Sequence, residues 1–179
     1  ANSLGILRDA SAAKALSEKL KTSDPRMRKS VSYALSKIQD ISSVPAILES
    51  LKQSRSTETA QDGRSMADPA VASSLLRSLG EMGDKTVIPK VKPFMEDPDS
   101  GVKISAAHAL YLLGDNSGVP LARKYLKDKD SGARKAAVDI LGEMGTADDL
   151  APLTALNGDP DPQVLESLHV AVQKLSAKL

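Results

Sequence analysis

The apolar residues of this chain recur with a fixed step of 31 residues. Two sets of positions keep that step, namely Val71, Val102, Ala133 and Val164, and Leu79, Leu110, Leu141 and Val172. Between the two positions of each copy, apolar or small residues follow three or four residues apart, which is the spacing of one helix face. A period of this length is typical of solenoids, in which short helical hairpins stack and bury one another's apolar faces.

The pattern predicts five copies of one helix, which we call helix B. Its first core position is Met27, Val71, Val102, Ala133 or Val164. Three residues earlier each copy carries an Asp, whose carboxylate suits the N-cap; these are Asp24, Asp68, Asp99, Asp130 and Asp161. Three copies end at Gly83, Gly114 or Gly145, for which we expect the left-handed conformation of a C-terminal cap.

Another amphipathic segment, helix A, precedes each helix B. Most of its prolines lie near the predicted helix starts, whereas Pro93 lies deeper and should distort its helix. The fold class is therefore predicted to be all-α, a single α-solenoid over residues 1–179. Its five helical hairpins are expected at about 10–40, 41–84, 85–115, 116–146 and 147–179.

The chain departs from the regular repeat in two ways, by an insertion and at its ends. The step from Met27 to Val71 is 44 residues, so 13 extra residues form a polar insertion within 52–67. We expect a long loop there, either a binding loop or a functionally neutral one. Residues 1–9 look like the remnant of a preceding repeat, and the last helix B is apolar nearly all round. These ends suggest a fragment of a longer array, or ends that pack on a partner, with end-to-end self-association as a further option.

The runs Asp97-Pro-Asp-Ser-Gly-Val-Lys and Asp128-Lys-Asp-Ser-Gly-Ala-Arg, each followed by an Ala/Leu-rich helix, resemble HEAT repeats. The short period is similar to that of bacterial repeats of the phycobilisome-lyase-like type. The resemblance implies a right-handed superhelix with A helices outside and B helices lining the concave face. It also implies a ladder between neighbouring repeats, formed here by Asp97, Lys103, Asp128, Arg134 and Asp159. Arg28 occupies the basic position of the first repeat, where Thr22 replaces the Asp, and Ala72 and Leu165 interrupt the basic positions of the second and fifth.

The composition fits a folded, soluble protein, with 41% apolar and 26% charged residues and no cysteine. No apolar run approaches the ~20 residues that span a bilayer, and no signal-peptide pattern is present. We expect a cytoplasmic or periplasmic location. Charge is unevenly placed, because residues 1–55 carry ten basic and five acidic side chains whereas residues 136–179 carry two and seven. A basic front and an acidic back would steer a partner or a second copy of the chain.

No pattern in the sequence indicates catalysis, a cofactor or a metal. The chain lacks a Gly-rich phosphate loop, a His-Glu-x-x-His run and a Gly-x-Ser-x-Gly elbow, and its two histidines, His108 and His169, have no companion at ligand spacing. The runs starting at Asp97 and Asp128 imitate a calcium loop but lack its later ligands. We therefore expect neither an enzyme nor a bound cofactor or metal.

The exposed face of the B helices is the best candidate binding surface. It would present the row Tyr33, Arg77, His108, Asp139, Val170 and the row Lys29, Ser73, Ile104, Lys135, Glu166. Tyr and Arg are enriched where interfaces store binding energy, so the predicted partner-binding residues are Lys29, Tyr33, Arg77, His108, Tyr111 and Lys135. The expected function is a protein-interaction or scaffold module that binds a protein or peptide. The alternatives are a nucleic-acid-binding repeat, which the dispersed basic residues and scarce aromatics disfavour, and a bilin-lyase-like subunit.

Overall fold

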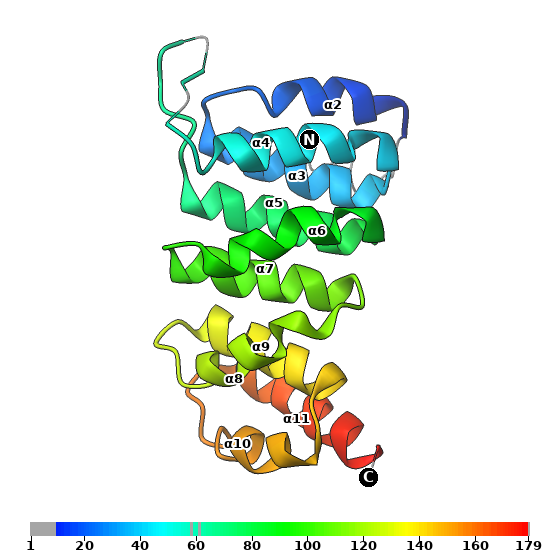
Figure 1. Ribbon diagram of the computed structural model, residues 1–179, viewed down its shortest axis with the longest axis vertical. Helices are drawn as coiled ribbons and strands as arrows, with labels where there is room; N and C mark the ends of the chain where they lie inside the picture. The colour runs from blue at the N-terminus through cyan, green and yellow to red at the C-terminus, as the bar shows by residue number, and fades with distance from the viewer. Residues whose placement is uncertain (1–9, 58, 61, 179) are drawn as a thin grey trace. The chain divides into compact units, whose positions relative to one another are not determined.

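The computed structural model describes residues 10–57, 59–60 and 62–178, and these residues form a succession of helices (Figure 1). The remnant predicted at residues 1–9 lies outside the described residues. The second helix of each pair is long, and these helices are α3 (Pro25–Ile38), α5 (Pro69–Met82), α7 (Ser100–Leu112), α9 (Ser131–Met144) and α11 (Pro162–Ser176). The first helices are shorter, and they are α2 (Ala13–Lys19), α4 (Val44–Gln53), α6 (Ile88–Val91), α8 (Val119–Tyr125) and α10 (Leu150–Thr154). The architecture is an all-α solenoid of helical hairpins.

A short 3-10 turn leads directly into each first helix. These turns are η1 (Ala10–Ala12), η2 (Ile41–Ser43), η3 (Lys85–Val87), η5 (Asn116–Gly118) and η6 (Ala147–Asp149). A further 3-10 segment, η4 (Lys92–Glu96), follows α6 and contains Pro93. Proline cannot donate the hydrogen bond that an α-helix needs at that depth, so the predicted distortion at Pro93 is confirmed.

The long helices begin at an aspartate whose side chain accepts backbone N–H groups. Asp68, Asp99 and Asp130 each accept from the residue three positions later, and Asp24 and Asp161 accept from the residue two positions later. Each bond satisfies a donor that has no partner inside the helix. This repeated cap sets the same starting point for every long helix.

The helix ends are less uniform than the sequence suggested. Gly83 and Gly114 have φ of 73° and 81°, in the left-handed region, whereas Gly145 has φ −73° and ψ 176° and is extended. The prediction for Gly145 was therefore wrong. A side chain there is excluded for a different reason, because a Cβ would lie 2.3 Å from the carbonyl oxygen of Leu141. In the first repeat a non-glycine residue, Gln39, adopts φ 58° at the equivalent end.

The chain divides into two compact units, Ala1–Pro89 and Lys90–Leu179, which we call the N-terminal and C-terminal units. In the N-terminal unit α3 packs against α2 and α5, and α4 packs against α5. In the C-terminal unit α9 lies between α7 and α11 and also contacts α8. Aliphatic side chains fill both interiors, including Val31, Leu35, Ile47, Leu75 and Leu79 in the first and Val138, Ile140, Leu141, Leu153 and Val164 in the second.

Two predicted positions in the repeat pattern differ from the structure. Met27, predicted as a core residue, is 41% exposed, and its neighbour Arg28 is buried instead. Ile104, predicted on the exposed face of its helix, is buried in the core of the C-terminal unit. The burial of a side chain depends on the helices packed next to it, and the repeat pattern does not specify those neighbours for each copy.

Candidate functional site

Arg28 is the most deeply buried charged side chain among the described residues, with 1% of its surface exposed. Its guanidinium extends from α3 toward the end of α4 and the insertion. Nη1 donates to the carbonyl oxygen of Met66 at 2.7 Å, and Nη2 donates to the carbonyl oxygen of Ser50 at 2.8 Å. Nε and Nη2 also donate to the hydroxyl of Ser50, at 3.2 Å and 3.0 Å. Burial lowers the pKa of Arg28, and the charge of Asp68 partly opposes that shift.

Arg134 is the corresponding side chain of α9, but its partner is a carboxylate. Nε and Nη2 donate to the two oxygens of Asp159 at 2.7 Å and 2.8 Å, and Nη1 donates to the carbonyl oxygen of Asp128 at 2.9 Å. Such a two-point arginine–carboxylate pair is the strongest common form of salt bridge. The hydrogen bonds from Arg134 hold the pKa of Asp159 below its usual value.

The remaining members of the predicted ladder do not form the same contact. Neither a hydrogen bond nor an ion pair joins Lys103 to Asp128 in the described part of the chain. Asp97, Asp128 and Asp159 do share a local contact, since each accepts the backbone N–H of the residue two positions later, and Asp159 makes it in addition to its pair with Arg134. Met66 lies three 31-residue steps before Asp159 and so occupies the same repeat position. Its backbone carbonyl accepts the hydrogen bond from Arg28. Ser50 stands at the repeat position of Leu156. A polar residue where the last repeat has an apolar one is the feature of the sequence that indicates a different partner for Arg28.

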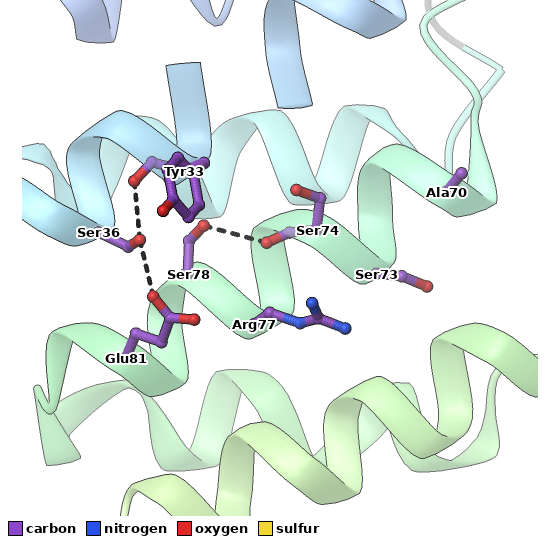
Figure 2. Close-up of a pocket in the computed structure, with 8 residues that line it drawn as sticks. All are labelled: Tyr33, Ser36, Ala70, Ser73, Ser74, Arg77, Ser78 and Glu81. Atoms are coloured by element: carbon purple, nitrogen blue, oxygen red, sulfur yellow. Dashed lines mark hydrogen bonds between the residues drawn. The ribbon is translucent and has the colours of Figure 1, made fainter. Parts of the chain in front are cut away.

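An open groove lies between α3 and α5 in the N-terminal unit, with a volume of about 210 Å³. Its lining residues are Tyr33, Ser36, Ala70, Ser73, Ser74, Arg77, Ser78 and Glu81. Figure 2 shows the ring of Tyr33 reaching from α3 over the small side chains of α5, while Arg77 extends along α5. Tyr33 is 46% exposed although it is a large ring. The groove therefore offers an accessible aromatic surface next to a cation.

The acidic side chain that lines this groove, Glu81, already has partners within the protein. Glu81 accepts from Ser36 Oγ and from Lys37 Nζ, each at 3.0 Å. The same ammonium of Lys37 lies 5.1 Å from the centre of the Tyr33 ring, within cation–π distance. Lys37 thus links the ring of Tyr33 to the carboxylate of Glu81, while Tyr33 stays half-exposed.

The C-terminal unit has a polar cluster on the corresponding faces of α7 and α9. Asp139 Oδ2 lies 2.8 Å from Lys135 Nζ and 3.8 Å from His108 Nε2, and the rings of His108 and Tyr111 have centres 5.4 Å apart. Burial alone would raise the pKa of Asp139, but His108 and Lys135 outweigh it and hold that pKa below its usual value. Burial, followed by the charge of Glu143, raises the pKa of Tyr111.

The six predicted partner-binding residues therefore fall into two groups. Tyr33 and Arg77 line the groove of the N-terminal unit, and Lys29 lies one helical turn before Tyr33 on α3. His108, Tyr111 and Lys135 belong to the cluster of the C-terminal unit. The sequence placed Asp139 and Ser73 on the exposed face without marking them as partner-binding residues, and it did not indicate Glu81, because the contacts of these side chains depend on the neighbouring helices.

The insertion predicted within 52–67 leaves the end of α4 and returns to the start of α5 (Figure 1). Its return is held by the buried side chain of Met66 and by the bond from Arg28 to the Met66 carbonyl. Ala60 N donates to the carbonyl oxygen of Arg64, and Gly63 has φ 77°, so this part makes a tight turn. Ser23 Oγ also donates to Asp62 Oδ2 at 2.5 Å.

Within the described ranges, no three His, Cys, Asp or Glu side chains gather as a metal site would require. Among the helices that the structure describes, none has the length and apolar character needed to cross a membrane.

The helical hairpins match a known family of repeats. The family of HEAT repeats matches residues 64–121 and 112–172, which together cover more than half of the chain. The chain belongs to the HEAT-repeat family. No curated protein sequence matches this HEAT-repeat chain.

Solved structures share the fold of this HEAT-repeat chain. The complex of CpcE and CpcF of phycocyanin lyase from Nostoc sp. PCC7120 matches with a TM-score of 0.61 and 23% identity, covering 97% of this chain and 72% of that chain. An engineered protein matches with a TM-score of 0.55 and 19% identity, covering 98% and 88% of the two chains. At these identities the likeness shows the fold alone.

Proposed function

We propose that this HEAT-repeat chain is a protein-interaction module that binds a segment of a partner protein at the exposed face of its second helices. The observation that carries the proposal is the groove between α3 and α5, where a half-exposed Tyr33 lies beside Arg77 and small side chains. Tyr and Arg are the residue types that most often dominate binding energy, particularly where a concave surface lets a partner exclude water from them. Membership of the HEAT-repeat family supports a scaffold that presents such a surface.

The His108–Tyr111–Asp139 cluster would serve as a second contact region on the same kind of surface. Its side chains already pair with one another, so it would add selectivity more than affinity. We therefore expect the groove of the N-terminal unit to supply most of the binding energy.

A displayed library of short random peptides, selected against the purified chain, tests this proposal. Peptides enriched on the wild type should lose binding to Tyr33→Ala/Arg77→Ala and retain most of it with Tyr111→Ala. The control is Lys52→Ala/Lys90→Ala, which changes two exposed lysines outside the groove. Enriched peptides that bind all three variants equally, or no enrichment at all, would reject the groove as an interaction site.

The alternatives are separated by two further measurements on the same samples. Binding of random oligonucleotides that weakens steeply with salt, in the absence of peptide binding, would favour a nucleic-acid-binding repeat. An absorbance change on mixing with a bilin, lost in His108→Ala/Tyr111→Ala, would favour a role like that of the phycocyanin lyase whose fold is shared.

A further inference from the structure

The groove of the N-terminal unit has one cation in its lining, Arg77, and a second on the adjoining surface of α3, Lys29, that no described acidic side chain pairs with. Arg77 forms no ion pair or hydrogen bond with any described side chain, and Lys29 also lacks an ionic partner there. The nearest acidic side chain lining the groove, Glu81, is engaged by Lys37 and Ser36. Two positive charges therefore lie on the surface near a half-exposed aromatic ring.

The polar groups still available in this groove are one guanidinium and two hydroxyls. The guanidinium of Arg77 carries five N–H donors and no acceptor, and the hydroxyls of Tyr33 and Ser73 have no partner among the described residues. By contrast, the hydroxyl of Ser74 lies 3.0 Å from that of Ser32, and Ser78 Oγ donates to the carbonyl oxygen of Ser74. The hydroxyls can donate or accept, whereas Arg77 can only donate and carries a positive charge, so a ligand that binds Arg77 supplies an acceptor and is favoured by negative charge.

The equivalent place in the C-terminal unit shows what a neutralised groove looks like. There Asp139 binds Lys135, and Lys174 binds Glu143 at 2.6 Å, so each charge faces an opposite charge. Val170 stands at the repeat position of Arg77, and the cavity measures only about 50 Å³. Unpaired cations are thus a property of the N-terminal groove and not of the repeat.

We propose that the groove between α3 and α5 binds an acidic segment of a partner protein, with a carboxylate at Arg77 and the adjoining side chain against Tyr33. Lys29 extends the positive field toward the start of α3. This inference rests on the proposed function and names the partner chemistry of the same site. A glutamate or aspartate side chain matches the planar fork of Arg77 with two parallel hydrogen bonds.

A nucleic acid would also bring negative charge, but this groove suits it less well. Single strands are held by several aromatic rings along a continuous basic track. Here Tyr33 is the one aromatic residue that lines the groove, and the lining includes the carboxylate of Glu81, which Lys37 pairs with. The carboxylate of Glu81 would lie beside a phosphate chain that continued past Tyr33.

The test measures fluorescence anisotropy of four labelled probes with the full chain. The probes are a peptide of alternating Glu and Ser, the matched Gln–Ser peptide, the matched Lys–Ser peptide and a single-stranded oligonucleotide. We expect the Glu–Ser peptide to bind tightest, and Arg77→Gln to weaken it about tenfold or more. Lys29→Gln should weaken it less, and the control Lys52→Gln, an exposed lysine of α4 outside the groove, should leave it unchanged.

The outcomes separate this inference from the proposed function. Equal binding of the Glu–Ser and Gln–Ser peptides, tighter binding of the oligonucleotide, or no binding of the Glu–Ser peptide would each overturn the acidic-segment inference. If library selection still yields peptides that depend on Tyr33 and Arg77, the interaction function stands and only the partner chemistry is rejected. Because Arg77 is exposed and unpaired, its substitution should leave the unfolding curve of the protein unchanged, and that measurement excludes misfolding as the cause of lost binding.

Discussion

The groove between α3 and α5 and the groove between α9 and α11 occupy the same place in the repeat, yet they differ in width. The N-terminal groove is lined by Ser36 and Ser78, and the C-terminal groove has Gly142 and Ala171 at the matching repeat positions. A Cβ placed on Gly142 would lie 2.5 Å from that of Ala171. The C-terminal helices therefore approach more closely, and the cavity shrinks from about 210 Å³ to about 50 Å³.

The same two places also differ in charge. The pair Lys37–Glu81 links α3 to α5, and the pair Glu143–Lys174 links α9 to α11 with the signs reversed. Asp139, at the position of Tyr33, draws Lys135 into an internal pair. A repeat thus fixes where a groove falls, while a few side chains at the crossing decide whether that groove is open and charged toward a ligand.

Among the differences between the two units, the contacts of the buried arginines should have the largest effect on stability. Arg28→Ala should lower the free energy of unfolding of the N-terminal unit by about 3–5 kcal/mol, because it leaves a cavity and buried acceptors of Ser50 and Met66 without donors. Urea denaturation measures the total loss, and amide hydrogen exchange should place it in residues 10–89.

The matched control for this prediction is Arg26→Ala. Arg26 is exposed on the same helix, and such surface substitutions usually change stability by less than about 0.5 kcal/mol. Equal losses for the two variants would show that the Arg28 contacts contribute nothing to the stability of the unit.

Widening the tight crossing of the C-terminal unit should have a smaller effect. Gly142→Ala should destabilise that unit by about 1–3 kcal/mol, since the new methyl group would overlap the Cβ and Cα of Ala171. Gly158→Ala is the matched control, because a Cβ there meets nothing within 4 Å. If Gly142→Ala unfolds at the same urea concentration as Gly158→Ala, the close approach of α9 and α11 at Gly142 does not contribute to the stability of the unit.

Acid should reduce the stabilisation from the Arg134–Asp159 pair and leave that from the Arg28 hydrogen bonds unchanged. Since Arg134 lowers the folded pKa of Asp159, that stabilisation is present above the unfolded pKa of about 3.9 and is lost as the pH falls below it. Arg28 has uncharged acceptors and gives no such dependence. We therefore expect urea titrations from pH 6 toward pH 2.5 to show a smaller acid-induced loss of stability in Asp159→Asn than in the wild type.

The control in the acid series is Asp148→Asn, which removes an exposed carboxylate of the same unit. Its acid-induced loss should match that of the wild type. An unchanged pH dependence in Asp159→Asn would contradict the assignment of the Arg134–Asp159 pair as an acid-sensitive contact.

The sequence predicted most of the fold because its signals were local and repeated. Asp caps, prolines and apolar stripes act within one helix, so the long helices could be recognised from their own residues. The errors arose where a helix end or a side chain depends on neighbours, as with Gly145, Met27 and Ile104. The ladder shows the same limit, since Arg134 met the predicted carboxylate whereas Arg28 met carbonyl and hydroxyl oxygens.

The sequence predicted which helix face carries the candidate site, but not which side chains on that face pair with one another. Helical spacing placed Tyr33, Arg77 and His108 in one row, but it did not indicate that Lys37 and Ser36 would engage Glu81. It also did not indicate that Asp139 would be neutralised internally. Those pairings depend on the distance between neighbouring helices, which is set by residues such as Ser36 and Gly142.

The bond from Arg28 to the backbone carbonyl of Met66 has a consequence for how this protein can change over generations. A carbonyl is present whatever residue occupies position 66, so the bond does not constrain the side chains of the insertion. The entropic cost of closing a loop also grows only slowly with its length. We therefore expect the segment between α4 and Met66 to accept changes in length and composition while the helices on either side stay in register, whereas position 66 itself keeps an apolar side chain because Met66 is buried.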